Sequence, residues 1–200
     1  MIKRSTLFSV LITGYSILNR RKNFVHNFSH SKRVFYNNIC ILGLRAIPFL
    51  RVLLLTSIWH DVGQSDFKQQ AKYHHIYSAR LFKFFTKENK YTDIVVNIIL
   101  CHRNRGANAQ YCPKTLLQQA FFDADKLDVL NIPRSKKLIK MYSRGFSCGE
   151  FNIKDTICFW EDFITNGENI LFLEKSKKLF RQRKNAFVKF VSEIKGKYNV

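Results

Sequence analysis

The side chains that could perform chemistry are histidines and aspartates, and they are concentrated in the first two thirds of the 200 residues. An acidic segment, FFDADKLD at 121–128, follows the last histidine. If the intervening segments are helices of one bundle, imidazoles and carboxylates converge in its core, where helical bundles build metal sites. The six histidines are His26, His30, His60, His74, His75 and His102.

The segment RVLLLTSIWHDVGQ (51–64) places an imidazole and a carboxylate side by side. An apolar run ends at Trp59 and is followed directly by His60 and Asp61, which indicates that the pair is buried. A buried imidazole and carboxylate need partners, so the pair either binds a metal ion or forms a hydrogen-bonded structural unit. We expect Gly63 to let the chain turn away and leave the site open.

The other polar groups carry weaker patterns. His26 and His30 are four residues apart and share a face if they are helical, with a purely structural role as the alternative. Asp125 and Asp128 also share a helical face. Because apolar residues surround this acidic segment, we expect one of its three aspartates to face inward. A solvated acidic helix is the alternative.

The elements that must position these groups are predicted to be helices. The chain has only 3 Pro and 8 Gly, and long stretches lack a helix breaker. Apolar periodicity continues into the last third, where residues 135–200 are expected to pack on the front bundle as a basic helical extension. We therefore predict an all-α protein with helices near 4–18, 29–45, 48–60, 70–87, 91–103 and 113–130, Pro113 opening the last, and two more near 153–164 and 168–198.

The net charge and the N-terminus bear on partners and location. A formal charge of +20 attracts polyanions such as nucleotides, nucleic acid or acidic lipid headgroups. Residues 1–22 are read as a first core helix, although an acid-free start also suits an organellar transit peptide. The apolar stretch 39–59 is interrupted by charges and a proline, so we expect two buried helices and no integral membrane association. Five scattered cysteines without a C-x-x-C favour a reducing, cytoplasmic location.

Taken in order, these motifs resemble the HD-domain superfamily of metal-dependent phosphohydrolases. The similarity covers residues 23–134 and implies an HD-type helical bundle. Each piece alone is a weak signal, but five pieces in the right order are specific. The pieces are HNFSHSKRV (26–34), LLLTSIWHDVGQ (53–64), HHIYSARLF (74–82), IILCH (98–102) and DADKLDVLNIPR (123–134).

The resemblance implies roles for individual residues. It places Asp123 beside the metal site, where it would orient a ligand or the backbone. His26 would contact a phosphate or transfer a proton, and His75 is read as structural. The implied metal ligands are His30, His60, Asp61 and Asp125, and a second ion or the substrate would lie at His74 and His102. Phosphate contacts are expected from Arg33, Arg103, Arg105, Lys126 and Arg134.

Three positions depart from the family pattern. Asn27 replaces an aspartate, Gln64 stands where a basic residue is expected, and Lys126 stands where arginine is common. Lysine binds phosphate as a point charge without the fork of arginine. These changes leave the four ligand positions intact and bear on the choice of substrate.

The resemblance implies hydrolysis of a phosphate ester or anhydride, with a nucleotide as the expected substrate. The ligand set of histidines and aspartates suits Mn²⁺, Mg²⁺, Fe or Zn²⁺, as one ion or as two. Asp61, His26 and Lys126 are the expected catalytic residues. Two alternatives stay open: a dinuclear phosphodiesterase acting on dinucleotides or nucleic acid, and a non-catalytic HD fold that binds nucleic acid through its basic surface.

Overall fold

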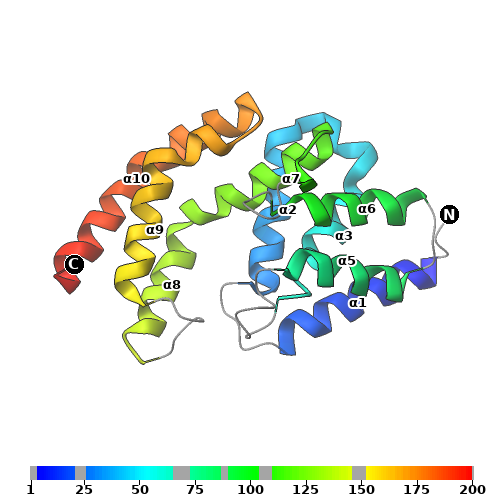
Figure 1. Ribbon diagram of the computed structural model, residues 1–200, viewed down its shortest axis with the longest axis horizontal. Helices are drawn as coiled ribbons and strands as arrows, with labels where there is room; N and C mark the ends of the chain where they lie inside the picture. Colours follow the sequence, from blue (N-terminus) through cyan, green and yellow to red (C-terminus); the bar gives the residue numbers. More distant parts are fainter. Residues whose placement is uncertain are drawn as a thin grey trace.

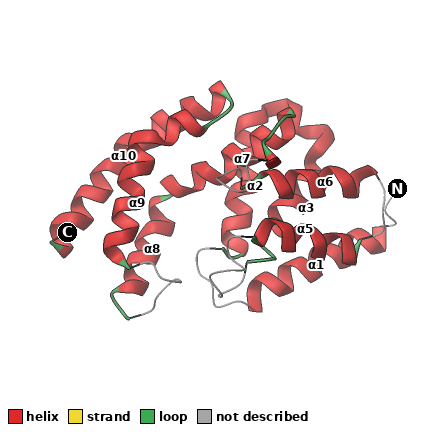
Figure 2. Cartoon of the chain, viewed as in Figure 1, coloured by secondary structure: helices red, strands yellow, loops and turns green. Residues whose placement is uncertain are grey.

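The computed structural model describes residues 4–20, 26–64, 73–86, 90–103, 110–145 and 152–199. Within these ranges every regular element is a helix (Figure 2), which confirms the predicted all-α class. In chain order the elements are α1 (Arg4–Arg20), α2 (Phe28–Leu42), η1 (Gly43–Phe49), α3 (Leu50–Trp59), α5 (His74–Phe85), α6 (Lys90–Cys101), α7 (Leu116–Leu127), η3 (Asp128–Leu130), α8 (Ile132–Tyr142), α9 (Ile153–Asn166), η4 (Gly167–Ile170) and α10 (Glu174–Tyr198).

The apolar stretch Phe28–Trp59 folds back on itself. By length and composition alone it could cross a membrane, and it is the one such stretch in the described part of the chain. A straight helix would separate its ends by roughly 45 Å. Instead, η1 interrupts it, with Gly43 at φ 59° and Pro48 inside the 3-10 turn. The turn brings the start of α2 beside the end of α3 (Figure 1).

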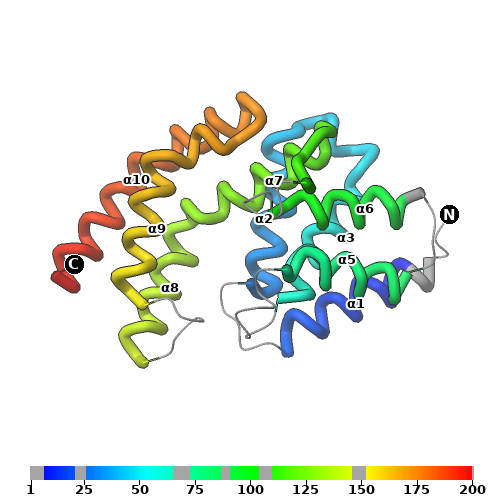
Figure 3. The backbone as a smooth tube through the Cα atoms, in the orientation of Figure 1, coloured from blue at the N-terminus to red at the C-terminus, as the bar shows by residue number. Residues whose placement is uncertain are grey.

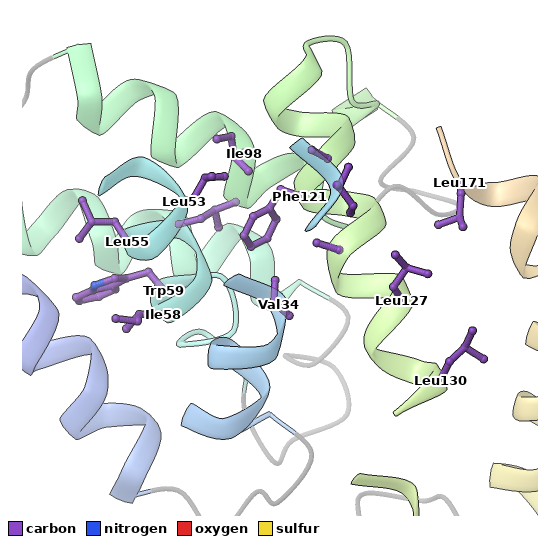
Figure 4. Close-up of a cluster of buried hydrophobic side chains, with 14 of the residues drawn as sticks. Val34, Leu53, Leu55, Ile58, Trp59, Ile98, Phe121, Leu127, Leu130 and Leu171 are labelled. Carbon is purple, nitrogen blue, oxygen red and sulfur yellow. The ribbon is translucent and has the colours of Figure 1, made fainter. Parts of the chain in front are cut away.

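A buried apolar cluster joins these helices to α1, α6 and α7 (Figure 4). Trp59 is fully buried in this cluster and donates a hydrogen bond from its indole nitrogen to the carbonyl of Val10 at 3.2 Å. Gly14 approaches the same indole so closely that an added Cβ would lie 2.7 Å from the Trp59 ring nitrogen. Helix α1 is therefore an integral part of the core.

The start of α7 and the presence of α8 differ from the sequence predictions. Pro113 does not open α7, because the helix begins three residues later, at Leu116, after a capping box formed by Thr115 and Gln118. Helix α8 was not predicted, and it starts where the Asn131 side chain accepts a hydrogen bond from the backbone N–H of Arg134. Asn131 followed closely by Pro133 is a helix-start signal that could have revealed it.

The C-terminal helices α8, α9 and α10 form a layer at one end of the molecule (Figure 3). Their own core contains the aromatic rings of Trp160, Phe163, Phe180, Phe187 and Phe190. The layer is attached to the front bundle mainly through α7 and η3. This attachment matters for function because α7 also carries a candidate site residue.

Candidate metal centre

Four polar side chains converge where α2, the turn after α3 and α7 meet. His30 Nε2 lies 3.2 Å from His60 Nε2, 3.2 Å from Asp125 Oδ1 and 3.4 Å from Asp61 Oδ2. His60 Nε2 lies 3.1 Å from the same Asp61 oxygen. The fold therefore brings together all four residues that the sequence suggested as metal ligands, close enough to surround a single ion.

The positions of the protons on the two imidazoles indicate which kind of ligand the cluster can bind. His60 Nδ1 lies 2.9 Å from the carbonyl of Ser57, so this nitrogen donates and Nε2 of the neutral ring carries a lone pair. His30 Nδ1 likewise lies 2.7 Å from Asp128 Oδ2, a carboxylate that accepts. Both Nε2 atoms and the Asp61 and Asp125 carboxylates are then acceptors facing one another. Such a set fits a divalent cation.

The ionisation equilibria agree with this need for a positive charge. Burial lowers the pKa of His30, but hydrogen bonds with Asp125, Asp128 and Asp61 outweigh burial and raise the pKa well above its usual value. Burial raises the pKa of Asp61, yet its interactions with the imidazoles of His60 and His26 hold it well below the usual range. A proton on His30 therefore supplies the positive charge that a cation would otherwise provide.

A second cluster shares Asp61. The other oxygen of this carboxylate, Oδ1, lies 3.2 Å from His74 Nε2 and 3.7 Å from His102 Nε2. His102 Nδ1 donates to the carbonyl of Ile99 at 2.6 Å, and burial lowers the pKa of His102 to about 3. Its Nε2 therefore carries a lone pair, 2.8 Å from His74 Nε2.

His74 differs from the other histidines in the placement of its proton. Arg103 donates from Nη1 to His74 Nδ1 at 2.9 Å, so the neutral His74 ring carries its proton on Nε2. That proton points toward Asp61 and His102, where a second ion would need a lone pair. In this arrangement the second cluster is satisfied by a hydrogen bond, whereas the first needs a positive charge, either from a proton on His30 or from a metal ion.

Two further predicted catalytic residues touch the ligands directly. His26 donates from Nδ1 to Asp61 Oδ2 at 2.6 Å, and burial lowers its pKa. Its Nε2 is then a lone pair suited to accepting a proton. Lys126 donates to Asp125 Oδ2 at 2.6 Å and to the carbonyl of His102 at 3.3 Å. Lys126 therefore holds the carboxylate oxygen of Asp125 that does not face His30.

The role of Asp128 was not predicted from the sequence. This fully buried carboxylate accepts from His30 Nδ1, from Arg33 Nε at 2.6 Å and from Arg33 Nη2 at 3.0 Å. Arg134 Nε lies 3.6 Å from Asp128 Oδ2. Asp128 orients His30 and lies against the guanidinium groups of both arginines. Its position one helical turn after Asp125 could have indicated this role.

The expectation that only one of the three aspartates would face inward was wrong. Asp123 and Asp128 are both buried, and Asp125 lies in the ligand cluster. Of the two roles expected for Asp123, orienting a ligand or orienting the backbone, the structure shows the second. Its two oxygens accept the backbone N–H groups of Phe172 and Leu173 at 3.0 and 2.9 Å, so it fastens the C-terminal helices to α7.

Gly63 has a different structural role from the one predicted. It does not open the site, because it packs against the first turn of α5, where an added Cβ would lie 2.3 Å from the carbonyl of His74. Its N–H donates to Ser78 Oγ at 2.7 Å. The contact places His74 against Asp61. His75 is buried beside the site, and Arg105 lies outside the described residues.

Comparison with known proteins is consistent with this arrangement. The family model of the HD domain matches residues 27–130, more than half of the chain, so the protein belongs to the HD-domain family. Its whole length also resembles the crystal structure of a protein from Lactobacillus plantarum, a structural-genomics target. The TM-score is 0.63 at 17% identity, covering 100% of this chain and 99% of the other. No curated protein matches the sequence.

Proposed function

We propose that this protein is a phosphohydrolase that uses one divalent cation to hydrolyse a nucleotide or a related phosphate compound. The observation that carries the proposal is the set of facing acceptor atoms on His30, His60, Asp61 and Asp125. These residues would hold the ion. When bound, such an ion supplies Lewis acidity toward a phosphoryl oxygen and makes a nearby water more acidic.

The chain's own groups supply proton transfer and charge. His26 is neutral near pH 7 because burial lowers its pKa, and its Nε2 accepts the proton of the attacking water. Asp61 holds His26 in this tautomer. Lys126, Arg33 and Arg134 supply positive charge toward the phosphoryl oxygens. Membership of the HD-domain family supports hydrolase chemistry, and the net charge of +20 favours a polyanionic substrate.

The number of ions separates this proposal from the dinuclear phosphodiesterase. The proton on His74 Nε2, fixed by Arg103, favours a single ion at the first cluster. The second cluster still contains Asp61, His74 and His102 within reach of one ion. Two ions per chain, both lost when His74 or His102 is replaced, would favour the phosphodiesterase instead.

The decisive experiment combines elemental analysis with a nucleotide hydrolysis screen on the wild type and on Asp61→Ala. We expect one ion per chain and phosphate release in the wild type, and neither in the variant. The matched control is Asp93→Ala, which removes an exposed aspartate on α6. A metal-free, inactive wild type that binds RNA with a steep salt dependence would instead support the non-catalytic nucleic-acid-binding alternative.

A further inference from the structure

A cationic cavity opens beside the metal centre, between the first turns of α2 and α8. Its volume is about 210 Å³, and its polar lining comes from Asn27, Ser29, Arg33, Arg134 and Lys137. Three of these five side chains are cations, and no carboxylate lines the cavity within the described residues. The positive ends of two helices add to this charge, because α2 begins at Phe28 and α8 at Ile132. The cavity is therefore built for an anion.

The arginines of the cavity are fixed before any ligand arrives. Arg33 donates twice to the buried Asp128, which holds its guanidinium in place. Arg134 Nη1 donates to the backbone carbonyl of Asp128 at 3.4 Å. Its Nε is buried and has no hydrogen-bond partner among the described residues. Asp128 supplies one negative charge against two guanidinium groups, so positive charge remains for a ligand.

The residues that line the cavity are neighbours of the residues that form the metal centre. Asn27, which lines the cavity, directly follows His26, and His26 donates to Asp61 at 2.6 Å. Asp128, which gathers the two arginines, also accepts from His30. The Nε of Arg134, which also lines the cavity, lies 3.6 Å from Asp128 Oδ2, the oxygen that accepts from His30. A ligand can therefore occupy both sites at once.

The size of the cavity limits what it takes. Pockets for whole drug-sized ligands occupy about 300–1,000 Å³. At about 210 Å³ this cavity suits the anionic part of a larger molecule. We propose that it binds a second phosphoryl group of the substrate while the first lies at the metal centre. The substrate class is then a phosphoanhydride, such as a nucleoside di- or triphosphate, in preference to a phosphate monoester.

This inference rests on the proposed hydrolase function and narrows its chemistry. One water is added across the P–O–P link, and the water oxygen forms a bond to the attacked phosphorus. The P–O bond to the bridging oxygen breaks, and that oxygen keeps the electron pair. One proton of the water goes to His26, and the other stays on the product phosphate. The cations of the cavity stabilise the charge on the second phosphoryl group.

Lys137 provides the cleanest test because it is exposed, whereas the arginines also hold Asp128. Binding of inorganic pyrophosphate and of orthophosphate is measured by calorimetry on the full chain. We expect the wild type to prefer pyrophosphate. Lys137→Met should weaken pyrophosphate binding about tenfold, the effect of losing one charge-assisted contact. Lys137→Arg should restore most of the binding, and Lys136→Met, an exposed neighbour on the same helix, should not change it.

The outcomes separate this inference from the proposed function. Equal pyrophosphate affinity in Lys137→Met and Lys136→Met, with both variants folded, overturns the subsite whether or not the protein is a hydrolase. Pyrophosphate binding that depends on Lys137 supports the subsite even if no substrate is hydrolysed. A wild type that hydrolyses nucleoside monophosphates but not di- or triphosphates would also overturn the assignment of a phosphoanhydride substrate.

Discussion

Replacing Asp128 by asparagine tests whether one buried carboxylate organises both the metal centre and the cationic cavity. Asp128 accepts from His30 at 2.7 Å and from Arg33 at 2.6 and 3.0 Å, and Arg134 Nε lies 3.6 Å from its Oδ2. Asparagine keeps the shape but removes the charge. Two guanidinium groups and the Nδ1–H of His30 then lose their ionised partner.

The pKa of Asp128 sets the size of the effect. Burial raises this pKa, but the hydrogen bond and charge of His30, together with Arg33, lower it to about 2. Compared with an ordinary aspartate, this shift corresponds to about 2 kcal/mol in favour of the ionised, folded form. Breaking a buried ion pair costs about 3–5 kcal/mol. Because Arg33 is a quarter exposed, we expect a loss of about 2–3 kcal/mol in the free energy of unfolding.

Metal affinity should fall as well, because a residue that orients a metal-binding histidine typically contributes about 10- to 100-fold. The assays are urea unfolding and metal titration of the wild type, Asp128→Asn and the exposed control Asp93→Asn. The folded pKa of Asp128 lies below its unfolded value, so its stabilisation is present above about pH 4. It is lost as the pH falls toward 2. The difference between variant and wild type should therefore shrink over that range. Metal affinity and stability within 0.5 kcal/mol of the control would refute this account of Asp128.

Two further predictions address packing and proton linkage. An added Cβ at Gly63 would lie 2.3 Å from the carbonyl of His74 and 2.4 Å from the N–H of Ser78, so Gly63→Ala should lower the melting temperature and metal affinity. Gly196→Ala, with open space around it in α10, should stabilise the protein by up to about 1 kcal/mol. Because three carboxylates raise the pKa of His30, metal binding near pH 7 should release about one proton from it. Calorimetry in buffers of different ionisation enthalpy measures this proton, and enthalpies that do not depend on the buffer would contradict it.

The sequence was sufficient for the elements and residues whose signals are local. The apolar run that ends at His60 and Asp61 predicted a buried pair, and helical periodicity predicted the all-α class. The order of motifs predicted the HD-domain family, which the match to residues 27–130 confirms. Each of these signals lies in neighbouring residues or in the order of segments along the chain.

The features that the sequence analysis missed depend on contacts between distant segments. Asp123 and Asp128 look alike in sequence, yet one binds the backbone at Phe172 and the other binds His30. Helical phase alone could not separate them, because their partners, Phe172 and Leu173 for Asp123 and His30 for Asp128, are far away in the sequence. The close approach of Gly63 to α5 likewise depends on where α5 packs. Lys126 follows Asp125 directly in the sequence, yet only the structure shows that its Nζ lies 2.6 Å from Asp125 Oδ2.

The charges around the centre explain how a strongly basic protein can hold both a cation and a polyanion in one place. The carboxylates of Asp61 and Asp125, together with Asp128, are matched in number by the cations of Lys126, Arg33 and Arg134. Without the ion, the proton on His30 adds a positive charge to the centre, and release of this proton compensates part of the charge that the ion brings. A bound divalent cation then makes the centre doubly positive, with the arginines facing the cavity. A bound ion therefore adds to the positive charge that already faces the cavity, and binding of pyrophosphate should be tighter with the ion present than without it.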